Sequence, residues 1–257
     1  MALSDHFREV RARFLRVSCY LVVAIAVALV MFEPLFDLVL APYQDAAEML
    51  GGEVDTKAVI MGIGQPLLLQ LKLSAVAAVV VTAPLWLWEL WRFLLPALHR
   101  NERRWSRVFA VVAGPLFLLG VAMGYYVMPV GIRVLLGFTN ANLESLVDFP
   151  NYFSFFVRTL LVFGISLEIP LFVIMLNLAG VLRGSTLGKY RSLIIIGTFV
   201  FAAVATPTTD PFGMLMLGIP MLLLFFAAEG IARLVDRSRD RKAGSLAALS
   251  DDEASPL

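Results

Sequence analysis

Charged residues and residues suited to catalysis are scarce in this chain of 257 residues. Only 16% of the residues are charged and 60% are apolar, whereas soluble domains have about 25% charged and 45–50% apolar residues. The single cysteine, Cys19, excludes an intrachain disulfide. The two histidines, His6 and His99, lack metal-ligand spacing, and no GxSxG or P-loop pattern occurs. We therefore expect no enzyme, no bound metal and no cofactor.

The apolar residues are gathered into continuous runs, which predicts an all-α integral membrane protein with six transmembrane helices. The last two runs are short, because residues 193–205 rise about 20 Å as a helix against about 30 Å of hydrocarbon. Residues 1–16 are expected to form a cytoplasmic amphipathic helix in the membrane interface. Residues 233–257 are expected to be a disordered cytoplasmic tail, which leaves 17–232 as the transmembrane domain. The expected spans are about 17–37, 73–94, 108–128, 152–178, 193–205 and 212–228.

The cations are segregated by connector, and this predicts the orientation. Most of the 21 Lys and Arg residues lie in the N-terminal segment, the connectors at 92–107 and 180–191, and the C-terminal tail. Lys57, Lys72, Arg133 and Arg158 lie elsewhere. Because cytoplasmic loops carry the excess of cations, both termini are expected in the cytoplasm. The segregated charge gives no indication of nucleic-acid binding.

Three carboxylates lie within or near the apolar runs, where an acid at the bilayer centre costs at least about 2.5 kcal/mol. Glu89 and Glu229 lie near cytoplasmic ends, where snorkelling or pairing with Arg92 or Arg233 explains them. Glu168 lies deep in the fourth run and is either functional or a carboxyl kept neutral by burial. The second possibility for the whole chain is thus an ion-coupled transporter of small solutes that uses Glu168, although no inverted repeats are visible.

A basic connector at 93–107 joins the second and third runs and contains one acid, Glu102. The excess of cations in cytoplasmic loops explains the arginines of this connector, but it does not explain an acid. A second acid, Glu9, lies in the other cytoplasmic segment. Each carboxylate either pairs with a neighbouring arginine or is available to bind a guanidinium group by two hydrogen bonds.

Several motifs occur in an order that resembles the TatC family, the receptor subunit of the twin-arginine protein translocase. The resemblance covers about residues 5–235 and agrees with the short last pair of spans. The motifs are FREVRARF from Phe7, LAPY from Leu40, WELWRF from Trp88, PALHRNERR from Pro96, FGISLEIP from Phe163 and ATPTTDPF from Ala205.

The resemblance implies a glove-like, concave bundle in the bacterial cytoplasmic membrane, surrounded by lipid. It implies a protein that binds twin-arginine signal peptides of folded precursors at its cytoplasmic face. It also implies assembly with single-span TatA- and TatB-type subunits, and with further copies of the chain, into a complex that exports folded proteins. The proton-motive force would drive this export.

The resemblance also carries over to single residues. Those matching the signal-peptide site are Glu9, Arg11, Phe93 and Glu102, and those matching structural or translocation positions are Pro42, Glu168 and Asp210. Hydrophobic mismatch favours association, so we expect partner helices to dock on the short last pair of spans, at Thr206, Met214 and Met216. The run from Thr206 to Asp210 is one residue longer than is usual in the family, and Met214 replaces a glutamine.

Overall fold

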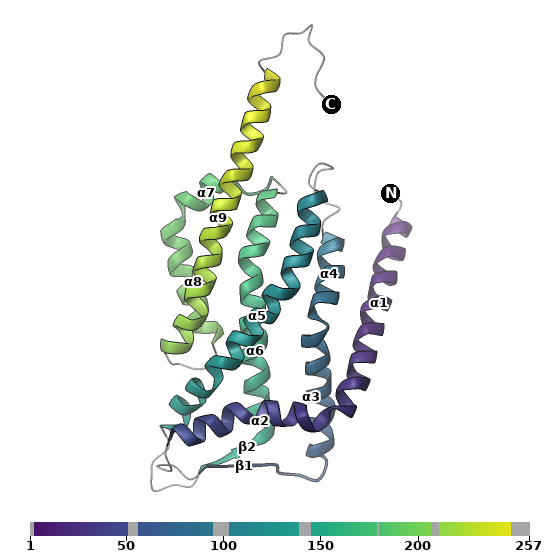
Figure 1. The fold of residues 1–257 in the computed structure, drawn as a ribbon, viewed down its shortest axis with the longest axis vertical. Coiled ribbons are helices and arrows are strands. Elements are labelled where there is room, and N and C mark those ends of the chain that lie inside the picture. Colours follow the sequence, from purple (N-terminus) through teal and green to yellow (C-terminus); the bar gives the residue numbers. More distant parts are fainter. Residues whose placement is uncertain are drawn as a thin grey trace.

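The computed structural model describes residues 3–50, 56–94, 103–138, 145–178, 180–206 and 211–247. Within these ranges the chain forms a bundle of side-by-side helices (Figure 1). Four helices contain a segment long and apolar enough to cross a membrane: α1 (Leu3–Val30), α5 (Arg103–Leu136), α6 (Phe149–Leu178) and α9 (Pro211–Ala247). A bent pair, α3 (Gln65–Val81) with α4 (Ala83–Leu94), and the 15-residue α8 (Arg191–Ala205) complete the six predicted spans.

The first helix is longer at its start and shorter at its end than the sequence predicts. Residues 3–30 contain neither glycine nor proline, so α1 continues without a break from the charged segment into the apolar run. The described part of the predicted N-terminal helix is therefore helical, but it is continuous with the first span and not a separate element. The expected end at residue 37 is wrong, because the ring of Pro34 blocks the carbonyl four residues earlier and α1 ends at Val30.

The chain then turns at Met31 into α2 (Phe32–Met49), which crosses the base of the bundle (Figure 1). Pro42 is fully buried inside α2 and does not lie in a loop. The Tyr152 hydroxyl of α6 donates a 2.6 Å hydrogen bond to the carbonyl of Val39, and the Tyr43 and Tyr152 rings lie 5.6 Å apart. These contacts attach α2 to the hydrophobic core.

The second span begins eight residues earlier than predicted and is bent by 57° between α3 and α4. Pro84 has no N–H to donate and its ring obstructs the preceding turn, so α3 ends at Val81. The Trp86 indole donates to the Val79 carbonyl at 2.9 Å, which satisfies one acceptor at the break.

The helices α5 and α6 form the centre of the bundle and approach closely at two glycines of α5. A Cβ atom on Gly120 would lie 2.5 Å from the carbonyl oxygen of Phe163, and one on Gly124 would lie 3.1 Å from the Phe163 Cβ. Small residues therefore allow the two backbones to touch, as a GxxxG spacing does in membrane helices.

At the base, two short strands add a small sheet that the sequence did not indicate. Strand β1 (Thr56–Val59) pairs in parallel with β2 (Ser145–Asp148), with Thr56 opposite Ser145. Each strand has four residues, which is too short for a recognisable alternation.

At the other end, both termini lie on the same side of the bundle as the short helix α7 (Gly184–Lys189) (Figure 1). The sixth span is predicted to end near residue 228, but α9 continues to Ala247. The prediction of a disordered tail from residue 233 is therefore wrong for residues 233–247. Six of the residues 233–242 are Arg, Lys or Leu, which favour a helix, and neither glycine nor proline interrupts the segment.

Candidate functional site

At the end of the bundle that carries both termini, α1 and α4 lie close together and present charged side chains to each other. Glu9, Arg13 and Arg16 follow one another at intervals of four and three residues, which places them on one face of α1. Glu89 and Phe93 are four residues apart and share the facing side of α4.

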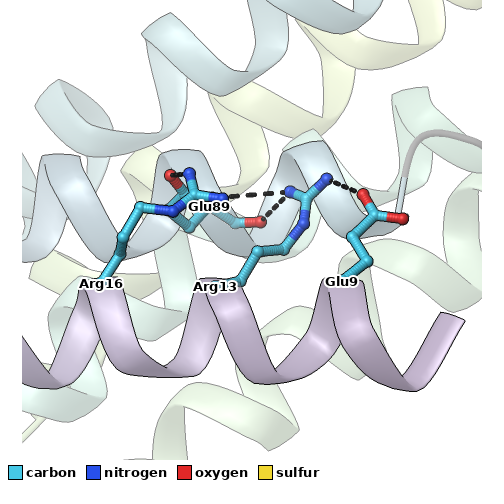
Figure 2. A network of polar contacts seen from close by, with 4 residues as sticks. All are labelled: Glu9, Arg13, Arg16 and Glu89. Carbon is cyan, nitrogen blue, oxygen red and sulfur yellow. Dashed lines mark hydrogen bonds and ion pairs between the residues drawn. The ribbon is translucent and has the colours of Figure 1, made fainter. Parts of the chain in front are cut away.

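These residues form a continuous polar network across the two helices (Figure 2). Arg13 pairs with Glu9 through Nη2, while its Nη1 donates a 3.1 Å hydrogen bond to the carbonyl oxygen of Glu89. Arg13 Nη1 also lies 3.5 Å from Glu89 Oε2, and Arg16 Nη1 lies 2.6 Å from Glu89 Oε1. The Arg13 guanidinium lies 6.0 Å from the centre of the Phe93 ring, at the limit of a cation–π contact.

Burial divides the network into an inner and an outer part. The side chains of Glu89 and Arg13 are 7% and 12% exposed, whereas those of Glu9 and Arg16 are 46% and 47% exposed. A buried carboxylate is costly unless cations and hydrogen bonds compensate for the lost water. Two arginines supply that compensation for Glu89, so the inner contact holds α1 against α4.

A groove of about 560 Å³ opens beside the network, between α1 and α4. Its walls are mainly apolar, with Phe14 and Leu21 from α1 and Trp86 and Leu90 from α4. Arg13 and Glu89 line it as well, so a charged group and an apolar segment would find neighbouring surfaces here.

The structure brings together two of the four residues expected at a peptide site. Glu9 and Phe93 both contact Arg13. Arg11 is exposed and forms no ion pair among the residues that the structure describes. Glu102 lies outside the described residues, although α4 ends eight residues before it and α5 begins directly after it.

The residues expected in structural or translocation roles lie apart from this network. Pro42 is in the core at the base, and Asp210 lies outside the described residues. Glu168 is half-buried in α6 beside the Trp91 indole of α4, but the two do not meet the geometry of a hydrogen bond. Within the described ranges, both Glu168 oxygens are buried without a hydrogen-bond partner.

The three residues expected to dock partner helices lie at the junction of α8 and α9. Thr206 is buried at the end of α8, where its hydroxyl donates a 2.8 Å hydrogen bond to Ala202. Pro207 follows in the sequence and favours the extended conformation of Thr206, which explains why α8 is short. Met214 and Met216 are half-buried against the core residues Phe163 and Leu217, so both methionines face the bundle.

Sequence reasoning missed the partners of Glu89. Its predicted partner, Arg92, was a near neighbour in the chain, whereas the structure supplies Arg13 and Arg16 from a helix more than 70 residues away. Glu229 was predicted to pair with Arg233 and does so at 2.6 Å, and Arg191 of α8 adds a second pair at 2.7 Å. The regular spacing of arginines on α1 was the available signal, but it does not identify the facing acid.

In the described part of the chain, no three His, Cys, Asp or Glu side chains lie close enough together to hold a metal ion. The arrangement can instead bind a cationic ligand through carboxylates at the edge of a membrane bundle.

Comparisons with known proteins agree with the motifs in the sequence. The profile of the family described as Sec-independent protein translocase protein (TatC) matches residues 5–220. A Sec-independent protein translocase protein TatC of Frankia casuarinae is 43% identical over the whole chain and 73% of its own length. The corresponding protein of Corynebacterium kroppenstedtii is 35% identical over the whole chain and 67% of its own length.

Solved structures show the same fold. A crystal structure of the twin-arginine translocase receptor TatC superposes with a TM-score of 0.68 at 27% identity, covering 89% of this chain and 98% of that one. A second crystal structure of that receptor, in the detergent DDM, superposes with a TM-score of 0.69 over 88% of this chain.

Proposed function

Because the chain belongs to the TatC family of Sec-independent protein translocase proteins, we propose that it binds twin-arginine signal peptides and nucleates a complex that exports folded proteins. We propose that the proton-motive force drives this export. The chain is a multi-pass membrane protein of a translocase family, which is not a family of enzymes. The alternative of an ion-coupled small-solute transporter is not supported.

The proposed location is the bacterial cytoplasmic membrane, with both termini in the cytoplasm. The described cations support this orientation, because Arg8, Arg13, Arg183 and Arg237 all belong to the end of the bundle that carries the termini. Cytoplasmic surfaces of membrane proteins carry the excess of Lys and Arg.

The observation that carries the proposed peptide site is the contact between Glu9 and Arg13. Glu9 is half-exposed at the edge of the α1–α4 groove and already pairs with a guanidinium group, which is the group that a twin-arginine peptide offers. Glu102 would supply a second carboxylate, and Phe93 an aromatic wall. Arg11 is proposed to border the site.

The proposed partners are single-span TatA- and TatB-type subunits, together with further copies of this chain. The junction of α8 and α9, with Thr206, Met214 and Met216, is the proposed docking edge for their helices. The shortness of α8 supports this, because a helix of 15 residues rises about 22 Å and mismatch with the bilayer favours association. Leu215 and Ile219 expose apolar side chains outward on the same stretch of α9.

A binding experiment tests the peptide site directly. The full chain in detergent is passed over an immobilised twin-arginine peptide as wild type, Glu102→Ala and Glu9→Ala, with Glu48→Ala as the control. Glu48 is an exposed acid of α2 at the opposite end of the bundle. We expect both site variants to lose retention and the control to keep it. Undiminished retention of Glu102→Ala and Glu9→Ala would refute the proposed site.

A further inference from the structure

Arg13 lies between two carboxylates and uses a different nitrogen for each. Its Nη2 pairs with Glu9, and its Nη1 contacts both the backbone carbonyl and the carboxylate of Glu89. Release of Glu9 would therefore leave both contacts with Glu89 in place. Figure 2 shows this bridge, with Glu9 on the same helix as Arg13 and Glu89 on the neighbouring helix.

The two halves of the bridge differ in their access to water. Glu9 is 46% exposed, so its pair with Arg13 is screened and easily exchanged. Glu89 is 7% exposed and also binds Arg16 at 2.6 Å, which makes the inner half a stable anchor. The Phe93 ring lies 6.0 Å from the same guanidinium, at the limit of a cation–π contact.

We propose that Arg13 is an internal competitor for Glu9, which an incoming guanidinium must displace before it can bind. The inference rests on the proposed function, because it takes Glu9 as a contact of the signal peptide. Arg13 pairs with Glu9 in the resting protein, and Glu89 retains the guanidinium when the peptide displaces it from Glu9. Arg13 thus sets an affinity threshold, and Glu89 acts as a positioning residue through Arg13.

The competition lowers the affinity of every ligand by the same factor, because the apparent dissociation constant is divided by the fraction of free Glu9. A pair of arginines binds carboxylates by forked hydrogen bonds and remains above the threshold. A pair of lysines offers point charges without this fork, so its affinity falls below the threshold. The contact with the carboxylates distinguishes arginine from lysine, and the internal competitor lowers both affinities, so that only the arginine pair still binds at low peptide concentration.

The experiment measures the dissociation constants of two fluorescent peptides by anisotropy, one with an Arg-Arg pair and one with a Lys-Lys pair. The full chain in nanodiscs is compared as wild type, Arg13→Gln and Arg8→Gln. Arg8→Gln is the matched control, since Arg8 is an exposed cation of the same helix that forms no ion pair among the described residues. It corrects for the general loss of positive charge.

We expect Arg13→Gln to strengthen the binding of both peptides by the same factor, roughly two- to fivefold, which is the worth of a half-exposed ion pair. Arg8→Gln should change both affinities less. Equal effects of the two variants, or weaker binding by Arg13→Gln, would overturn the inference. Arg13→Lys keeps the charge but loses the forked hydrogen bonds, so it should strengthen binding relative to the wild type, though less than Arg13→Gln. If Arg13→Gln does not fold, unchanged or weaker binding by Arg13→Lys would overturn the inference.

The role of Glu89 is tested by a double-mutant cycle. Glu89→Gln removes the carboxylate that retains Arg13 after its displacement from Glu9, so it should weaken peptide binding in the wild-type background. The same change should have no effect in the Arg13→Gln background. Equal weakening in both backgrounds would mean that Glu89 acts by general electrostatics, and would contradict its role through Arg13.

A further variant separates this inference from the proposed function. If Glu9→Gln leaves peptide binding unchanged, the proposed contact at Glu9 fails and the competition fails with it. If Glu9→Gln weakens binding but Arg13→Gln does not strengthen it, Glu9 still binds the peptide, and the competitor alone is refuted.

Discussion

Asn177, which is completely buried in α6, donates a 3.0 Å hydrogen bond to Asp236 of α9. The other carboxylate oxygen of Asp236 accepts a 2.7 Å hydrogen bond from the backbone N–H of Gly184, at the start of α7. One side chain from the supposed tail therefore attaches α9 to two other helices. The basic region after the last apolar run begins as part of the folded bundle.

We predict that Asp236→Ala destabilises the protein by about 1–3 kcal/mol, because it removes the acceptor of the Gly184 N–H and one of the two acceptors of the buried Asn177 amide. Thermal unfolding in detergent measures the change. Asp240→Ala is the control: Asp240 is exposed one turn later on α9, and its loss should change stability by less than about 0.5 kcal/mol. Equal losses for the two variants would show that Asp236 does not attach α9.

Gly120→Ala should destabilise the bundle by about 1–3 kcal/mol, because the added methyl group would overlap the α6 backbone at Phe163. Gly197→Ala is the matched change in α8, where a Cβ would meet no atom within 4 Å. There the better helix propensity of alanine should leave stability unchanged or raise it by up to about 1 kcal/mol. Unfolding curves of the two variants that coincide would contradict close packing at Gly120.

Glu168→Gln should separate stability from transport. Glu168 forms no ion pair with any described residue, so an amide of the same shape should cost less than about 1.5 kcal/mol of folding free energy. If export depends on an acid at this position, a twin-arginine reporter should be exported more slowly by this variant at equal protein level. Unchanged export would exclude a role for the carboxyl proton.

Crosslinking should place the partner helix on the outer side of α9 near Met214 and Met216. In a Cys19→Ser background, Leu215→Cys should form a disulfide with a cysteine in a single-span subunit, because Leu215 is 41% exposed. Met214→Cys should react less, since Met214 packs against the core. Val23→Cys on α1 is an apolar control that is more exposed than Leu215, at 59%. Stronger crosslinking there than at Leu215 would move the docking edge to α1.

Local chemistry made much of the architecture predictable. Continuous apolar runs indicate membrane helices wherever they occur. Pro84 and Pro207 act on the residues directly before them, so the bend after α3 and the short α8 follow from neighbours in the chain. The start of α1 and the end of α9 were misjudged because a change of polarity was taken as a change of structure. A helix continues through such a change until a breaker or a lost contact ends it.

The sequence by itself determined the six spans, the segregation of the cations and the motifs that resemble the TatC family. These are properties of single segments, and they can be recognised without knowing how the segments pack. Only the tertiary structure decided that Arg13 and Arg16 neutralise Glu89 and that Arg13 also holds Glu9. The physical reason is that a buried charge takes its partner from the helix packed against it. The network at Glu9, and with it the proposed competition at the peptide site, therefore arises where α1 meets α4.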